Sequence, residues 1–281
     1  MKNEPVHDRD KEESKHYYEY LRQQREIAES LKYASYIQQA LFPSTTLISG
    51  LMPEHFLFYQ PRELVSGDFY YVSGHHEFIF IAVGDCTGHG VPGAFMSMLG
   101  ITFLNEIISQ RHYSGAASIL NLMREHVMKA LCQTGNESEQ KDGIDLALCI
   151  VDTRKNKLDF AGAFNPVYIV REENLIEING DMMPVGIGPE EERPFTSRSF
   201  DLENMDTLYL FTDGYADQFG GPAGKKFKYK PFRDMLLNVS HLSMTDQKER
   251  IVNTFNTWKG NLRQLDDVLV FGFRYHSTTM P

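Results

Sequence analysis

Residues 78–93 read FIFIAVGDCTGHGVPG, and this stretch decides how the chain is interpreted. Its first six residues form an apolar, aromatic and β-branched run that is typical of a buried strand. Asp85 follows almost directly, and a glycine-rich loop then leads into a run with helical periodicity, where Pro92 suits the first helical turn. One aspartate after a strand is usually only a turn residue. Asp85 becomes a candidate functional residue if other strands of the chain also end in aspartate.

Three further stretches place aspartate beside glycine or a second aspartate at the edge of an apolar run. They are Ser66-Gly67-Asp68, Thr212-Asp213-Gly214 and Asp266-Asp267. Because strand ends in packed sheets meet along one edge, we expect these carboxylates to gather and to repel one another unless a cation balances them. Hard divalent ions, Mg²⁺ or Mn²⁺, prefer such oxygen ligands, and the backbone carbonyl of Cys86 is a further candidate. The glycine-rich loop 87–93 offers backbone N–H groups to an anion, so the combination suggests phosphate chemistry.

The rest of the chain predicts antiparallel sheets with helices grouped between the strands. Two helices are expected at 91–108 and 116–132, and a third at about 245–259. Strands are predicted at 56–60, 68–72, 78–83, 144–151, 157–161, 167–171, 175–178, 207–211 and 268–275. Most strands are joined by hairpins, which favours an α+β fold over alternating βαβ units.

The N-terminal part has a different texture. Residues 1 to about 16 are charged and without pattern, and we expect them to be a disordered or linker segment. A heptad stripe follows, and Pro43 ends the predicted helix. The stripe consists of Tyr17, Tyr20, Gln24, Ile27, Leu31, Ala34, Gln38 and Leu41. Two interpretations stay open: the helix packs on its own domain, or it pairs with a second copy of itself.

Composition excludes several classes of function. The 281 residues carry 28 Lys and Arg against 38 Asp and Glu, a net charge of −10, which argues against nucleic acid and against an anionic membrane surface as partners. The three cysteines, Cys86, Cys132 and Cys149, have no paired spacing, so neither disulfides nor a cysteine zinc site is expected. The N-terminus lacks a signal-peptide pattern, and no apolar run suggests a membrane span. We therefore expect a cytoplasmic protein.

Five motifs in order resemble the metal-dependent serine/threonine protein phosphatases (PPM, type 2C-like), in the bacterial branch typified by sporulation stage II protein E. The resemblance covers about residues 35–276, and the set is specific although no single motif is. The motifs are VSGDFY (65–70), GDCTGHGVPG (84–93), AGAFNP (161–166), LYLFTDG (208–214) and DDV (266–268).

The resemblance implies a protein phosphatase 2C-like fold: two antiparallel β-sheets in a central sandwich flanked by helices, preceded by an N-terminal linker helix. Residues 1–43 would form the disordered segment and the coiled-coil-like linker, and residues 44–281 the phosphatase domain. Two Mn²⁺ or Mg²⁺ ions are implied. Asp85 would bridge them, Asp213 and Asp266 would complete the shell of one, and Asp68 with the carbonyl of Cys86 would serve the other. Asp267 would lie just outside the ligands, and Asp217 would hold a water or a weakly bound third ion.

Three positions depart from the family pattern without removing a ligand. Leu269 replaces a hydroxyl residue, Phe164 precedes Asn165 where a polar residue is commoner, and Cys86 replaces a small residue. Arg62, six residues before Asp68, is the best candidate to hold the substrate phosphate, although it is equally an ordinary surface arginine. His89 could supply a proton or contact the phosphate, but a backbone-capping role in the glycine loop is the simpler interpretation.

The function implied is hydrolysis of phosphoserine or phosphothreonine on a bacterial signalling phosphoprotein by metal-activated water. By resemblance, the substrate would be an anti-sigma-factor antagonist, and a sensor domain or partner would act through the linker helix, with a homodimer formed along it. The alternative is a catalytically silent phosphatase-fold module that binds a signalling partner.

Overall fold

Antiparallel pairing builds two main sheets in the computed structural model, which describes residues 6–111, 113–134, 141–188 and 193–277. The first sheet has the order β1 (His55–Gln60), β13 (Val268–Arg274), β10 (Thr207–Phe211), β6 (Val167–Arg171) and β7 (Asn174–Ile178). The second has the order β2 (Phe69–His75), β3 (Phe78–Cys86), β4 (Gly143–Asp152), β5 (Lys157–Ala163) and β9 (Arg198–Asp201), with β8 (Val185–Gly186) pairing with β4.

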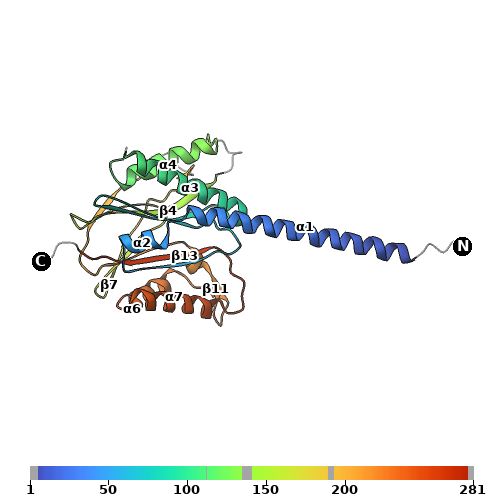
Figure 1. The fold of residues 1–281 in the computed structure, drawn as a ribbon. Helices are drawn as coiled ribbons and strands as arrows, with labels where there is room; N and C mark the ends of the chain where they lie inside the picture. The colour runs from blue at the N-terminus through green and yellow to red at the C-terminus, as the bar shows by residue number, and fades with distance from the viewer. Residues whose placement is uncertain (1–5, 112, 135–140, 189–192, 278–281) are drawn as a thin grey trace.

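The sheets stack face to face and helices cover both outer faces (Figure 1). The second sheet carries α3 (Gly90–Gln110) and α4 (Ala116–Ala130), and the first carries α6 (Tyr229–Val239) and α7 (Met244–Lys259). Short elements complete the chain: α2 (Thr45–Leu51), α5 (Gly214–Asp217) and the small hairpin of β11 (Phe219–Gly220) and β12 (Lys225–Lys226). The sandwich with flanking helices and a preceding N-terminal helix confirms the predicted fold class.

Alternation along the central strands explains the layers. In β3, Phe80 and Ala82 pack under α3 and α4, while Ile81 and Val83 face the other sheet. In β10, Leu208 and Leu210 face the second sheet, while Tyr209 and Phe211 pack under α6 and α7. Because neighbouring side chains of a strand point to opposite faces, a continuous apolar run fills two cores at once. The runs that ended in aspartate are therefore strands buried on both sides.

Helix α3 is long and apolar enough to cross a membrane by length and composition alone, but half of its most apolar window is buried inside the protein. Gly93, Met96, Ile101, Leu104 and Ile107 are among its buried residues. Its hydropathy is that of a core helix lying on a sheet.

Helix α1 (Val6–Leu41) is a single rod that leaves the sandwich at one end (Figure 1). We expected disorder up to about residue 16, and this was wrong from Val6 onward, while residues 1–5 lie outside the described residues. No glycine or proline interrupts residues 6–42, and charged residues such as Glu, Lys and Arg are good helix formers. A charged segment without apolar pattern can therefore still be helical.

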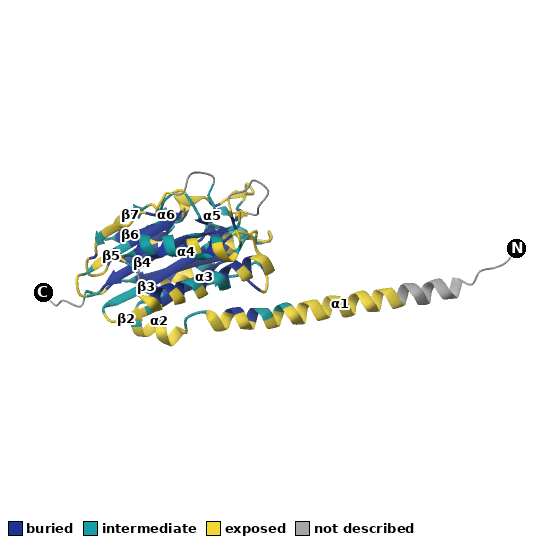
Figure 2. Ribbon diagram, turned by 90° about the horizontal axis from the view of Figure 1, so that it is seen from above, coloured by how far each residue is buried: buried dark blue, intermediate teal, exposed yellow. Residues whose placement is uncertain are grey.

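The heptad stripe of α1 has two different surroundings. Of the stripe residues, Gln38 is buried and Leu31 and Ala34 are half-buried, so this part of the stripe packs on the domain, whereas Leu41 at its end is exposed. Tyr17, Tyr20 and Ile27 are 60%, 57% and 54% exposed. The N-terminal part of the stripe, residues 17–27, is therefore exposed to solvent, and we call it the bare part of α1. Figure 2 shows this change along the rod, with buried turns only where α1 meets the sandwich. The interpretation of packing on its own domain is correct for Leu31, Ala34 and Gln38.

Candidate metal centre

Four aspartates lie at the same edge of the sandwich. Asp68 comes just before β2 and Asp85 is the last residue but one of β3, where the pair Phe69–Gly84 brings the two strand ends together. Asp213 comes two residues after β10, and Asp266 comes two residues before its antiparallel neighbour β13. The hydroxyl of Thr212 donates to Oδ2 of Asp68 at 2.7 Å, so the aspartate-bearing ends of the two sheets are in direct contact.

The carboxyl groups interact strongly with one another. Burial raises the pKa of Asp68 and of Asp85 well above the usual range, and the negative charges of Asp213 and Asp266 raise both pKa values further. Burial and the charge of Asp266 raise the pKa of Asp213 to about 6, although a hydrogen bond with Asp85 opposes this shift. Burial also raises the pKa of Asp266. The structure thus brings these four predicted residues into one electrostatic cluster.

A fifth carboxylate, which sequence reasoning missed, belongs to the same cluster. Asp145 lies in β4 directly opposite Asp85 in the antiparallel register. Burial and the charge of Asp213 raise its pKa to about 7. A signal was available in the sequence, because Asp145 is the one charged residue within the predicted strand 144–151.

Asp267 lies beside the cluster and binds the backbone of residues 62–67. Its side chain is 2% exposed. Oδ1 accepts the backbone N–H of Arg62 at 2.7 Å, and Oδ2 accepts that of Gly67 at 2.8 Å. Both of its oxygens are therefore directed to the backbone of the segment that leads into Asp68, which is a positioning arrangement.

Cys86 ends β3, with its thiol buried and the pKa of that thiol raised well above its usual value by desolvation. Its backbone carbonyl oxygen would lie 3.4 Å from a Cβ placed on Gly67, and the carbonyl oxygen of Gly88 would lie at 2.6 Å. Gly93 is in similarly close contact with Gly88. Glycine is required at these places because the Ser66–Asp68 segment, the glycine-rich loop and α3 approach one another backbone to backbone.

Arg62 and His89 lie at the rim, where both lower the pKa of Asp266 through their positive charge. The guanidinium of Arg62 donates from Nη1 to the carbonyl oxygen of Leu265 at 2.8 Å. His89 precedes α3, but its side chain makes no capping hydrogen bond, so the expected capping role was wrong. Its Nδ1 lies 3.1 Å from Oε1 of Glu63 instead. The imidazole of His89 therefore contacts the carboxylate of Glu63 and not the backbone at the start of α3.

Asp217 forms an ion pair with Lys226 of the hairpin of β11 and β12. Nζ of Lys226 in β12 donates to Oδ2 of Asp217 at 2.7 Å, and both side chains are substantially exposed. Lys226 also lowers the pKa of Asp213. A side chain of this basic hairpin therefore reaches the edge of the acidic cluster.

The chemical nature of these donors suits hard divalent cations. Carboxylate oxygens and a backbone carbonyl are the ligands that Mg²⁺ and Mn²⁺ prefer. Among the described residues, no group of three or more His, Cys, Asp or Glu side chains is arranged to hold a metal ion as it stands. Carboxylates that repel one another do not close into a cage unaided. Burial first, and then this repulsion, raises their pKa values, and a bound cation would favour the ionised carboxylates instead.

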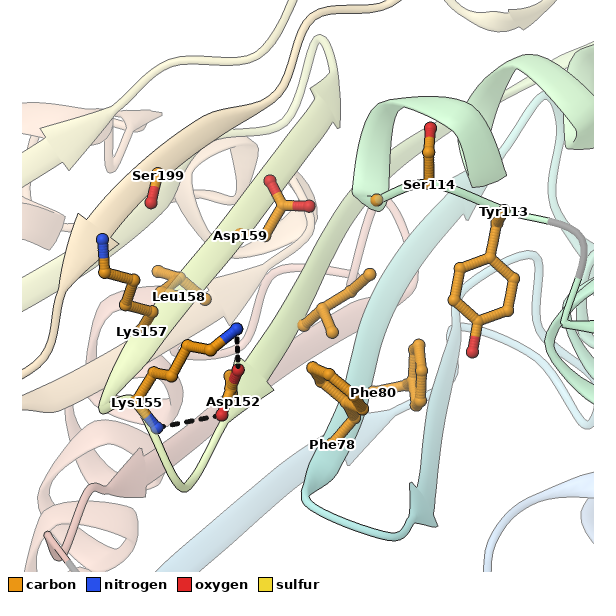
Figure 3. A pocket seen from close by; sticks show the side chains of 12 residues that line it. Phe78, Phe80, Tyr113, Ser114, Asp152, Lys155, Lys157, Leu158, Asp159 and Ser199 are labelled. Carbon is orange, nitrogen blue, oxygen red and sulfur yellow. Dashed lines mark hydrogen bonds and ion pairs between the residues drawn. The ribbon is translucent and has the colours of Figure 1, made fainter.

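A cavity of about 360 Å³ lies at the other end of the second sheet (Figure 3). Its apolar lining includes Phe80 and Leu158, and at its rim Nζ of Lys155 lies 3.5 Å from Oδ2 of Asp152. In the β3–β4 ladder this cavity is at the Phe78–Asp152 pair, eight residues from the Cys86–Ile144 pair, or about 27 Å at the usual rise per residue. None of the residues that line this cavity belongs to the acidic cluster.

Comparisons with known proteins agree with this geometry. The family model "Stage II sporulation protein E (SpoIIE)" matches residues 62–276. The solved "SiaA-PP2C domain of Pseudomonas aeruginosa" is 33% identical over 90% of this chain and 98% of its own, with a TM-score of 0.81. No curated protein matches the chain.

Two more distant structures share the fold. The PP2C phosphatase domain with a regulatory-domain fragment of SpoIIE from Bacillus subtilis is 18% identical with a TM-score of 0.64, and the match covers 80% of this chain and 63% of that one. RsbX in complex with magnesium is 11% identical with a TM-score of 0.54, and the match covers 79% of this chain and 94% of that one.

Proposed function

This chain belongs to the Stage II sporulation protein E family, and from that premise we propose that it is an active, metal-dependent phosphatase that hydrolyses phosphoserine or phosphothreonine on a bacterial signalling phosphoprotein. The convergence of Asp68, Asp85, Asp213 and Asp266 from four separate segments supports the proposal most directly. A domain that only binds a partner does not need four carboxylates that repel one another and so destabilise its fold.

The cofactors we propose are two Mn²⁺ or Mg²⁺ ions. Asp85 would bridge them, Asp213 and Asp266 would hold one, and Asp68 with the carbonyl of Cys86 would hold the other. The RsbX structure contains magnesium in this fold, which supports the choice of metal. When bound, such ions lower the pKa of water toward neutrality and offset charge on phosphoryl oxygens.

The chain's own residues then bind, orient and supply protons. Asp267 fixes the backbone of Arg62 and Gly67, and with it the approach of the phosphate to Asp68. The guanidinium of Arg62 is held at the rim of the cluster by the carbonyl oxygen of Leu265, from where it would contact a phosphate oxygen. His89, whose Nδ1 lies 3.1 Å from Oε1 of Glu63, would give a proton to the leaving serine or threonine oxygen. No side chain serves as the nucleophile, so no phosphoenzyme forms.

The experiment is an assay with p-nitrophenyl phosphate and with candidate phosphoproteins of the same genome, anti-sigma-factor antagonists first. We expect hydrolysis with Mn²⁺ or Mg²⁺, none with EDTA, and one oxygen from labelled water in the phosphate released. Binding of a phosphoprotein without hydrolysis under any of these metal conditions would favour the silent-module alternative. We place the reaction in the cytoplasm, where such signalling phosphoproteins are found.

We further propose that the bare part of α1 pairs with a second copy. The charges of this part lie off the stripe and pair within the helix: Arg22 with Glu26 at 3.1 Å and Arg25 with Glu29 at 2.9 Å. Two copies can therefore meet along Tyr17, Tyr20 and Ile27 without opposing like charges. A sensor domain or partner acting on this helix would change the geometry of the pair.

Replacing Tyr20 by aspartate should weaken this dimer at least about tenfold, because it buries a charge in the seam. Tyr18 is 70% exposed and lies off the stripe, so Tyr18→Asp is the matched control and should leave association unchanged. Sedimentation equilibrium over a range of protein concentrations measures both. A monomeric native chain, or equal effects of the two variants, would refute the pairing.

A further inference from the structure

The N-terminal helix reaches the candidate metal centre through one side chain, Gln38. This residue is 2% exposed, although most of its helix is in solvent. Its Nε2 donates to the carbonyl oxygen of Ser66 at 2.6 Å and lies 2.8 Å from Oγ of Ser97 in α3. Its Oε1 accepts the backbone N–H of Ser66 at 3.1 Å. The amide of Gln38 thus bonds both backbone groups of a single residue, as a neighbouring strand would.

Ser66 begins the segment that carries Asp68. The Oγ of Ser66 accepts the backbone N–H of Asp68 at 3.0 Å, so the two residues form one tight turn. The backbone N–H of Gly67 between them donates to Oδ2 of Asp267, and Oγ of Ser97 in α3 donates to the carbonyl oxygen of Ser66 at 3.1 Å. Three side chains therefore fix the backbone before Asp68, and Gln38 is the one that comes from the N-terminal helix.

The docking of α1 has a second, separate anchor. The ring of Phe42 stacks on Tyr70 with centroids 4.7 Å apart and meets Tyr59 edge-on at 5.4 Å. This contact is apolar and includes no backbone group of residues 66–68, although the hydroxyl of Tyr59 hydrogen-bonds the side chain of Ser66. Phe42 therefore reaches the Ser66–Asp68 segment only through Tyr59, whereas Gln38 bonds the backbone of Ser66 directly.

We infer that Gln38 is a positioning residue for the reaction: by fixing Ser66 it fixes Asp68, and so the N-terminal helix sets how tightly the cation proposed for Asp68 and Cys86 is held. This inference rests on the proposed function. Without the Gln38 amide, a buried N–H and a buried carbonyl of Ser66 lose partners, and the turn that leads to Asp68 is free to shift. Ligands misplaced by a fraction of an ångström bind metal less well even when all of them are present.

The test compares Gln38→Met, which conserves volume but cannot form these bonds, with Phe42→Ala and with Gln39→Leu at an exposed neighbouring position. Isothermal titration with Mn²⁺ gives the dissociation constant, and melting without metal gives the loss of stability. We expect Gln38→Met to weaken Mn²⁺ binding about tenfold with nearly native turnover at saturating Mn²⁺. Phe42→Ala should lower the melting temperature and weaken Mn²⁺ binding far less than Gln38→Met does, and Gln39→Leu should change neither.

Equal loss of Mn²⁺ affinity in Gln38→Met and Phe42→Ala would overturn the inference, because docking alone would then explain it. Unchanged affinity in Gln38→Met would overturn it as well. If Gln38→Met does not fold, Ser97→Ala decides, since it removes a second donor to the Ser66 carbonyl and should weaken Mn²⁺ binding by a smaller factor. A native chain that binds no Mn²⁺ at all would contradict the proposed function instead.

Discussion

Asp85→Asn is expected to lower the rate of p-nitrophenyl phosphate hydrolysis by about 10³-fold or more at any Mn²⁺ concentration. Asp85 interacts with Asp68, Asp213 and Asp266. Replacing its carboxylate by an amide removes the ligand that the two proposed metal ions would share. The same change should raise the melting temperature of the metal-free protein, because it deletes a buried charge that the other carboxylates repel. Activity and stability thus move in opposite directions.

Asp201→Asn is the matched control for this prediction. Asp201 lies in β9 of the same sheet, its side chain is 82% exposed, and it pairs with Lys157 at 3.4 Å. This variant should keep native activity and nearly native stability, since an exposed ion pair contributes little. Hydrolysis by Asp85→Asn within tenfold of the native rate, or a lower melting temperature without metal, would be incompatible with a bridging role.

In EDTA, the protein is expected to become less stable as the pH rises from 5.5 to 8. The pKa values of Asp145, about 7, and of Asp213, about 6, lie above the ordinary aspartate value. Between the ordinary value and these raised values the folded state binds more protons than the unfolded state, so the free energy of unfolding falls with increasing pH. The loss amounts to about 2 kcal/mol after allowance for partial exposure, or about 5 °C in melting temperature.

Saturating Mn²⁺ should remove this decline, because cations stabilise the ionised carboxylates of the folded state. In the metal-free protein, the Asp145→Asn, Asp213→Asn double variant should melt at a higher temperature at pH 8 and show a flatter profile. Differential scanning calorimetry at a series of pH values, with EDTA and with Mn²⁺, measures both effects. A melting temperature that rises from pH 5.5 to 8 in EDTA would mean that the carboxylates are already compensated within the chain.

Most of the sandwich could be predicted because its strands are buried on both faces. Runs such as 78–83 and 208–211 are apolar at every position, and so short an apolar run bounded by turn residues is typical of a strand that packs on both sides. Helix α6 was missed although its apolar face packs on β10 and β6, since it follows a glycine-rich hairpin and is only 11 residues long. Short helices carry too little periodicity to stand out.

The site was predictable in its acidic residues and less so in their partners. Aspartates beside glycine at strand ends are visible in a sequence, whereas Asp145 looks like one polar residue within a strand until the β3–β4 register places it opposite Asp85. The role of Gln38 was hidden for a similar reason. Its position in the heptad stripe suggested a polar interruption of a seam, and only packing reveals that the amide is bonded to the backbone of Ser66. Contacts between residues far apart in sequence depend on register and docking, which local pattern does not contain.

The unbroken course of α1 has a mechanical consequence. Its 36 residues span about 54 Å at the rise of an α-helix, with neither glycine nor proline to act as a joint. A stiff rod of this kind would act as a lever: a twist or a pull applied to its exposed turns would be carried along the helix to Gln38. Because Gln38 bonds Ser66, such a force would reach the backbone two residues from Asp68.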